Sequence, residues 1–318
     1  MTRQPVFVAR RVPAPVLAAL EERFEVMLHD SDSPASREEL LAGVRRARGL
    51  VSMLTDAVDA ELLEGAPHLE VVANHAVGVD NVDLGAARTR RVVVANTPDV
   101  LTDATAEFTL ALLLALVRRV AEGDRLLRRR EGWAWSPTFL LGRGLAGRTL
   151  GVVGLGRIGT AVARLGEALG MEVVYASRSE RPGVPWRRTR FGDLLPRADV
   201  ISLHVPLTDE TRGLVGAAEL RAMRPSAVLV NTARGPLVDE AALAEALRAG
   251  AIAGAALDVF EREPDVHPGL LDLENVVLAP HLGSATHEAR EAMGMLCVRA
   301  LEAVLLERRM PENAVDGD

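Results

Sequence analysis

The sequence predicts an α/β fold made of two βαβ domains, and three observations support this prediction. The chain has 318 residues, a length typical of two domains rather than one. Short β-rich runs alternate with helical patterns from the first residues, as they do in parallel sheets with helical crossovers. A second alternating series begins at Thr149, after a stretch with a different pattern.

The first series predicts one sheet and the helices that connect its strands. The expected elements are strands at 5–9, 49–54, 69–73 and 91–95 and a helix at 15–23. The pattern changes at Thr97 and Pro98, because proline restricts the residue before it. A single long helix is predicted at 102–130, followed by an aromatic stretch that contains Trp133 and Trp135.

The second series predicts another sheet. Its expected elements are strands at 149–153, 171–175, 227–231, 253–259 and 275–279 and helices at 160–169, 240–249 and 291–306. The helix at 240–249 has the clearest ends, because Asp239 can cap its first turn and Gly250 follows its last turn.

The charges exclude several classes of function. A net charge of −7 argues against a nucleic-acid partner, since phosphate binding needs a concentrated basic face. All 37 basic side chains are arginine, which excludes Schiff-base chemistry on lysine and the lysine-based phosphate loop. Two short arginine runs, at 128–130 and 187–188, are expected to form solvated surface.

Further absences bear on the protein's surroundings. Cys297 is the single cysteine, which excludes a multi-cysteine metal site, and we expect it to be buried and inert. No bound metal is expected. The N-terminus lacks the apolar core of a signal peptide, and the longest apolar run, at 108–117, is shorter than the roughly 20 residues that span a bilayer. A cytoplasmic protein with no membrane partner is expected.

A glycine-rich turn predicts a dinucleotide site. A buried-strand pattern runs directly into Gly154, Gly156 and Gly159, spaced as GxGxxG, and then into a helix. The motif alone is weak evidence, but this strand–turn–helix context is the one that its mechanism needs. The glycines permit a tight turn, close approach to a pyrophosphate and close helix packing. Arg157 and Ile158 would present free N–H groups to the anion.

The end of the next strand indicates which dinucleotide is preferred. An NAD-specific site places Asp or Glu about 20 residues beyond the first glycine, to accept from the ribose 2′-hydroxyl. This chain has Ser177 and Arg178 there, and a hydroxyl with a guanidinium suits a 2′-phosphate. We therefore predict a preference for NADP(H). The alternative is that Arg178 stacks on adenine and NAD(H) is used as well.

Three successive predicted strands are followed by Arg234, by Glu261 and Glu263, and by His281. Open α/β sheets bind ligands at the carboxyl ends of their strands. Reducing a keto acid needs a hydride donor, a cation for the carboxylate and carbonyl, and an acid for the developing alkoxide. A lone histidine after a strand is usually structural, but the three side chains together predict a catalytic group.

These segments closely resemble the D-isomer-specific 2-hydroxyacid dehydrogenases, over essentially the whole chain. The resemblance is strongest in the glycine loop, in NTARGPLVDE (231–240), and in LDVFEREP (257–264) with APHLGSATH (279–287). VLTDATAEF (100–108), the WSP segment at Trp135 and GSATH are most similar to the glyoxylate/hydroxypyruvate reductases, also called glycerate dehydrogenases. The resemblance implies reversible, NAD(P)H-dependent reduction of glyoxylate or hydroxypyruvate to glycolate or D-glycerate.

The resemblance also implies roles for single residues. Arg234 would bind the substrate carboxylate and carbonyl oxygen, and His281 would protonate that oxygen during reduction. Glu263, which the family pattern selects over Glu261, would hold the imidazole and favour its protonated form. Asp258 matches the family residue that accepts from the nicotinamide carboxamide.

Other positions are implied in the same way. Thr232 is expected to contact the cofactor. The backbone of Val77 and Gly78 matches the family's second carboxylate anchor, and Leu54 would line the same pocket.

The family's domain organisation is discontinuous. Residues 1–98 and 288–318 would form a flavodoxin-like substrate domain, and 99–287 would form an inserted Rossmann-like NAD(P)-binding domain. A homodimer is expected, with an arm at 133–141 crossing over so that Trp135 could reach the partner's active site. A simple interface anchor is the alternative for Trp135.

Two rival interpretations stay open. The chain could be another dehydrogenase on this scaffold, although a phosphorylated substrate would want cations near Leu54 and Val77, a phosphite substrate calls for lysine, and formate needs no Glu–His pair. It could also be a non-enzymatic protein that senses dinucleotides, because fold and site motifs do not prove turnover.

Overall fold

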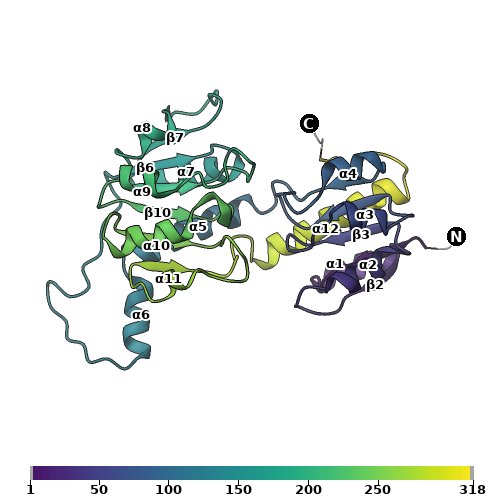
Figure 1. Ribbon diagram of the computed structural model, residues 1–318, viewed down its shortest axis with the longest axis horizontal. Helices are drawn as coiled ribbons and strands as arrows, with labels where there is room; N and C mark the ends of the chain where they lie inside the picture. The colour runs from purple at the N-terminus through teal and green to yellow at the C-terminus, as the bar shows by residue number, and fades with distance from the viewer. Residues whose placement is uncertain (1–2, 316–318) are drawn as a thin grey trace. The chain divides into compact units, whose positions relative to one another are not determined.

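The structure is a computed structural model that describes residues 3–315, and its contacts divide the chain into two compact units. Met1–Leu101 and Ala285–Asp318 form unit 1, and Thr102–Ser284 form unit 2. Each unit is a parallel sheet with helices on both faces (Figure 1). The predicted α/β fold class is confirmed.

Unit 1 contains a five-stranded sheet in the order β2-β1-β3-β4-β5. Its elements are β1 (Pro5–Val8), α1 (Ala14–Arg23), β2 (Glu25–Leu28), α2 (Arg37–Val44), β3 (Gly49–Ser52), α3 (Ala60–Glu64), β4 (Val71–Asn74), α4 (Leu84–Thr89), β5 (Val93–Ala95) and α12 (His287–Leu305). β3 and β4 are buried along their whole length, as inner strands covered on both faces should be.

The core of unit 1 has two layers. Side chains of α1 and α12 cover one face of the sheet, and those of α2, α3 and α4 cover the other. Cys297 lies in α12, and burial raises the pKa of its thiol to about 12. A thiol of this kind is unreactive at neutral pH. Within residues 3–315, no helix combines the length and apolar character needed to cross a membrane.

Unit 2 contains a seven-stranded sheet in the order β12-β11-β10-β9-β6-β7-β8. Its strands are β6 (Thr149–Val153), β7 (Glu172–Ala176), β8 (Arg187–Arg188), β9 (Val200–Leu203), β10 (Val228–Asn231), β11 (Gly254–Leu257) and β12 (Val276–Leu278). Its helices are α5 (Thr102–Val117), α6 (Val120–Arg128), α7 (Arg157–Ala168), α8 (Phe191–Leu194), α9 (Ala217–Ala222), the 3-10 helix η1 (Gly235–Leu237), α10 (Glu240–Arg248) and α11 (Pro268–Leu271). α5 and α7 cover one face, and α8 to α11 cover the other.

The single long helix predicted at 102–130 is wrong, because the structure contains α5 and α6 with a break between them. Arg119 has a left-handed backbone, with φ 55°, and occupies the N-cap position of α6 without a capping side-chain hydrogen bond. The N–H of Arg143, on the returning arm, donates to the carbonyl oxygen of Val117 at 2.8 Å and so caps α5. α5 buries seven residues whereas α6 buries none, so packing stabilises only α5 in this chain.

Some elements were not predicted, among them β2, β9 and α9, and the other differences are shifts at element ends. α7 begins at Arg157, three residues earlier than predicted, and α12 begins at His287, four residues earlier. Thr286 caps α12 by accepting from Ala289, a signal that the apolar periodicity did not contain. The expected caps of α10 are present, since Asp239 accepts from Ala242 and Gly250 has φ 66°.

Candidate functional site

The predicted cofactor and catalytic residues of unit 2 lie at the carboxyl ends of its strands. The strand order reverses between β6 and β9, since the chain passes from β6 to β7 on one side and later returns to β9 on the other. Open α/β sheets bind ligands in the crevice at such a reversal. Gly154 follows β6 and His204 follows β9, so the glycine loop stands at this position.

The glycine loop has the shape that a pyrophosphate needs. Gly154 has φ +94°, and a Cβ there would lie 2.6 Å from the carbonyl carbon of His204. A Cβ on Gly159 would collide with the carbonyl oxygen of Gly154. Gly156 faces open space, with nothing within 4 Å of a built Cβ, and α7 starts at the next residue. The loop therefore fits a nucleotide phosphate at the start of α7, where Arg157 and Ile158 also lie.

The end of β7 carries no carboxylate. Ser177 is partly buried, and its hydroxyl donates to the carbonyl oxygen of Ser179, while Arg178 is exposed. Thr232 lies elsewhere, at the end of β10, and is 8 % exposed. Its hydroxyl is 2.8 Å from that of Thr109, which itself donates to the carbonyl oxygen of Thr105. Thr232 therefore faces α5 with its side chain.

Arg234 follows β10 in a turn that Asn231 holds in place. The Asn231 amide donates to the carbonyl oxygen of Arg234 at 2.9 Å and accepts from the N–H of Ala233 at 3.0 Å. The Arg234 guanidinium donates to the carbonyl oxygen of Ala233 at 2.7 Å. The side chain is partly exposed, so a planar cation is presented from the end of a central strand.

Glu263 and His281 form a hydrogen-bonded pair. The Nδ1 of His281 lies 2.8 Å from Oε2 of Glu263, and their side chains are 25 % and 24 % exposed. The other carboxylate oxygen, Oε1, accepts from the N–H of Phe260 at 3.1 Å. Because an ionised carboxylate only accepts, Nδ1 must carry the proton, and Nε2 remains for another partner.

The backbone at His281 is strained in a way that serves this pair. His281 has φ 55°, and its N–H donates to the carbonyl oxygen of Asp258 at 2.8 Å. A residue other than glycine in this conformation is uncommon, although histidine adopts it more readily than most, and six other non-glycine residues of the described chain share it. The strand ends of β11 and β12, which are paired neighbours, thus place the imidazole beside the carboxylate.

Asp258 anchors the same turn. It is 1 % exposed, and its two carboxylate oxygens accept from the N–H groups of Leu282 at 2.7 Å and Gly283 at 2.8 Å. Burial raises the pKa of its carboxyl group, and these backbone bonds oppose the rise. Each oxygen can still accept a second hydrogen bond, for example from the carboxamide of a nicotinamide ring.

Two features of the site were not predicted from the sequence. Glu240 is 5 % exposed and accepts from the N–H groups of Glu261 at 2.6 Å and His267 at 3.1 Å, while Glu261 accepts from the N–H of Glu240 at 2.9 Å. Gly235 is the second feature, because a Cβ there would overlap the carbonyl group of Phe260. The start of α10 and the Arg234 turn are therefore locked to the segment that carries Glu263.

The predicted residues of unit 1 lie at the carboxyl edge of its own sheet. Leu54 follows β3 and is partly buried, and Val77 and Gly78 follow β4. The amides of Asn96 and Asn74 donate to the carbonyl oxygens of Val77 at 2.7 Å and Gly78 at 2.9 Å. No residue in the described part of the chain accepts from the N–H of Val77 or Gly78, so both donors are available to an anion.

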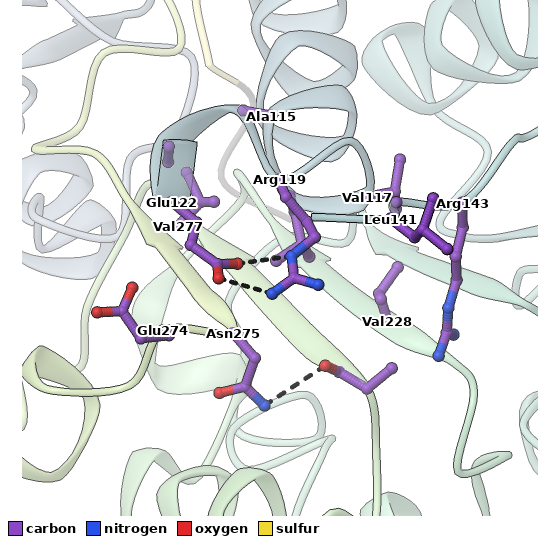
Figure 2. A pocket seen from close by; sticks show the side chains of 14 residues that line it. Ala115, Val117, Arg119, Glu122, Leu141, Arg143, Val228, Glu274, Asn275 and Val277 are labelled. Atoms are coloured by element: carbon purple, nitrogen blue, oxygen red, sulfur yellow. Dashed lines mark hydrogen bonds and ion pairs between the residues drawn. The ribbon is translucent and has the colours of Figure 1, made fainter. Parts of the chain in front are cut away.

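A cavity of about 250 Å³ lies at the other edge of the unit 2 sheet (Figure 2). It is bounded by the α5–α6 junction, the end of the arm at Leu141 and the amino ends of β10 and β12. Arg119 and Glu122 form an ion pair on its wall, with hydrogen bonds of 2.7 Å and 2.6 Å. None of the predicted site residues lines this cavity.

Comparisons with known proteins show which family this chain resembles. The family described as "D-isomer specific 2-hydroxyacid dehydrogenase, NAD binding domain" matches residues 110–283. A glyoxylate reductase of Thermococcus litoralis is 47% identical over 322 residues, covering 98% of this chain and 97% of the relative. A glyoxylate reductase of Aeropyrum pernix is 47% identical over 330 residues, covering 100% and 97%.

A solved structure is also similar. The NADPH-dependent glyoxylate/hydroxypyruvate reductase of Sinorhizobium meliloti, crystallised with NADP and malonate, has a TM-score of 0.86 and 37% sequence identity. The similarity covers 99% of this chain and 97% of that one.

Proposed function

The chain belongs to the D-isomer-specific 2-hydroxyacid dehydrogenase family, and we propose that it reduces glyoxylate and hydroxypyruvate with NADPH as the preferred donor. It is an NAD(P)-dependent dehydrogenase that converts small 2-keto acids to 2-hydroxy acids. The observation that carries the proposal is the hydrogen-bonded Glu263–His281 pair. Glu263 follows β11 and His281 follows β12, and β11 pairs with β10, the strand that precedes Arg234.

Each member of the trio has a proposed task. Arg234 holds the substrate carboxylate and polarises the carbonyl, because a guanidinium matches a carboxylate with two parallel hydrogen bonds. Glu263 fixes the proton on Nδ1 of His281 and stabilises the protonated ring. His281 then delivers the proton on Nε2 to the carbonyl oxygen as charge develops there, and takes it back in the reverse reaction.

Unit 1 is proposed as the substrate domain and unit 2 as the NAD(P)-binding domain. The available N–H groups of Val77 and Gly78 would bind the substrate carboxylate, and Leu54 would form an apolar wall. Hydrogen bonds from backbone N–H groups to a carboxylate are charge-assisted, and they add no second buried charge to the pocket.

The cofactor would lie along the carboxyl edge of unit 2. The pyrophosphate would lie against the glycine loop, formed by Gly154, Gly156 and Gly159. The ribose 2′-phosphate would bind to Ser177 and Arg178. The nicotinamide end would contact Asp258 and Thr232. When bound, the nicotinamide group supplies the two reducing electrons as hydride.

The test is to follow cofactor absorbance with glyoxylate, hydroxypyruvate and pyruvate, each with NADPH and with NADH. We expect fast oxidation of NADPH by the first two, and a lower kcat/KM with NADH because the site has no carboxylate for a free 2′-hydroxyl. Equal use of both cofactors would contradict the preference. Absence of turnover with every pair, together with measurable dinucleotide binding, would favour a sensing protein instead.

A homodimer is also proposed, because apolar side chains are concentrated on α6 and on the arm that follows it. Figure 1 shows this arm as a long open loop after α6. Val120 is 60% exposed, Leu127 58%, Trp133 57%, Trp135 79% and Leu141 63%. Exposed apolar surface of this extent marks an interaction site. Trp135 would then serve the partner's active site or anchor the interface.

We expect a dimer at micromolar concentration, and we expect Leu127→Asp to shift it towards monomer. An aspartate in a buried interface would leave a charge without a partner, at a cost of several kcal/mol. Light scattering measures the mass. Leu271→Asp is the matched control, because Leu271 is also 58% exposed but lies on α11. A monomeric wild-type protein, or equal effects of both substitutions, would contradict the proposed interface.

A further inference from the structure

Arg188 makes contacts that the sequence pattern did not suggest. It is exposed, as expected for this arginine run, and it lies in β8, the edge strand that pairs with β7. Its Nε donates to the carbonyl oxygen of Ser177 at 3.0 Å, and its Nη2 donates to the same oxygen at 2.8 Å. Nη2 also donates to the carbonyl oxygen of Arg178 at 2.6 Å. One guanidinium therefore holds two successive carbonyl groups.

The surroundings of this contact are strongly basic. Between residues 177 and 188 the chain has four arginines and one acidic residue, Glu180. The four are Arg178, Arg181, Arg187 and Arg188. Within residues 3–315, none of these four guanidinium groups forms an ion pair with a carboxylate. Their positive charge is not neutralised by the protein, so this segment is electrostatically suited to an anion.

The direction of the hydrogen bonds matters for an anion. A phosphate repels carbonyl oxygens and attracts N–H, O–H and guanidinium groups. Arg188 donates hydrogen bonds to the carbonyl oxygens of Ser177 and Arg178, the two residues proposed to bind the 2′-phosphate. Nη2 alone bonds both carbonyl oxygens, and Nε adds a second bond to that of Ser177, so one rigid guanidinium plane orients both groups.

We propose that Arg188 is a positioning residue that sets specificity for the 2′-phosphate of NADP(H), by fixing the backbone on which Ser177 and Arg178 stand. The inference rests on the proposed preference for NADP(H). It predicts that Arg188 acts on ligands with a 2′-phosphate and not on the rest of the nucleotide.

The experiment is isothermal titration of the full-length protein with adenosine 2′,5′-bisphosphate and with 5′-AMP, which needs no turnover. Arg188→Ala is expected to weaken bisphosphate binding by about tenfold or more, the effect of losing hydrogen bonds to a charged group, with 5′-AMP nearly unchanged. Arg188→Lys should not restore binding, because an ammonium keeps the charge without the fork. Arg187→Ala is the matched control, since Arg187 is an exposed arginine of the same strand without these contacts.

The outcomes distinguish the role of Arg188 from the proposed preference for NADP(H). Equal losses in Arg188→Ala and Arg187→Ala would show that net charge alone matters and would overturn the inference, as would full rescue by Arg188→Lys. Equal losses for both ligands would overturn the specificity. If Arg178→Ala loses bisphosphate affinity while Arg188→Ala does not, the cofactor preference stands and only the role of Arg188 fails. If the wild-type protein binds both ligands equally, both proposals fail.

Discussion

Replacing His281 with alanine is expected to lower kcat for keto-acid reduction by about 100- to 10,000-fold, the range typical of a positioned general acid. The imidazole is held by one hydrogen bond from Nδ1 to Glu263 and stands at the end of β12. The other histidine at a strand end of unit 2, His204, has its Nε2 engaged at 2.8 Å with the hydroxyl of Ser202. Steady-state kinetics with NADPH measures the effect, and cofactor affinity should stay near that of the wild type.

Glu263→Gln tests whether the Glu263–His281 pair needs a side chain that accepts hydrogen bonds at both of its terminal atoms. Both carboxylate oxygens accept, one from Phe260 and one from His281. A glutamine amide has only one accepting atom, so its NH₂ group must face either the Phe260 N–H or Nδ1 of His281. The first is a donor–donor contact, and the second keeps the proton off Nδ1, so the protonated ring that gives up its Nε2 proton is no longer stabilised. We therefore expect a large loss of kcat with little change in protein stability.

Glu261→Gln is the matched control for Glu263→Gln. Glu261 is two residues away, but its carboxylate accepts from Glu240 and does not meet the imidazole. The control is expected to keep most of the wild-type turnover. Unchanged turnover in both His281→Ala and Glu263→Gln would remove the pair from the mechanism, and a larger loss in Glu261→Gln would show that the wrong carboxylate was chosen.

The sequence contained enough to predict the strand ends and the pairing of residues there. Parallel strands put their carboxyl ends at one edge, so three polar residues that follow three successive strands had to lie near each other. This reasoning depends on strand order alone and is insensitive to ends that shift by a few residues. It is why a glutamate after β11 was expected beside His281, and the family resemblance selected Glu263 over Glu261. Glu263 and His281, eighteen positions apart, lie 2.8 Å apart.

Three of the features that were missed depend on contacts between distant segments. The break after α5 needs the N–H of Arg143, which returns to Val117 from the far end of the arm. Glu240 reaches Glu261 across 21 positions, and nothing local distinguishes it from another helix-start glutamate. The contacts of Arg188 were missed for the same reason. A short arginine run predicts only exposed side chains, and it is the β7–β8 pairing that brings Arg188 to Ser177.

Gly235→Ala is expected to abolish most activity, through geometry rather than chemistry. A Cβ at this position would overlap the carbonyl group of Phe260, which is backbone and cannot rotate away. The segment that carries Glu263 must then move, and a displacement of about 1 Å in a catalytic group can cost about 100-fold in rate. We also expect a loss of about 1–3 kcal/mol in the free energy of unfolding, as for other overpacked sites.

Gly192→Ala is the control for this substitution, because a Cβ there meets nothing within 4 Å and Gly192 lies in the helix α8. Alanine is a better helix former than glycine, so the control should be neutral or slightly stabilised. Denaturant unfolding and kcat are measured on both variants. A Gly235→Ala protein with wild-type kcat would mean that the Arg234 turn and the Glu263 segment can separate without harm, and that their close packing does not position the catalytic pair.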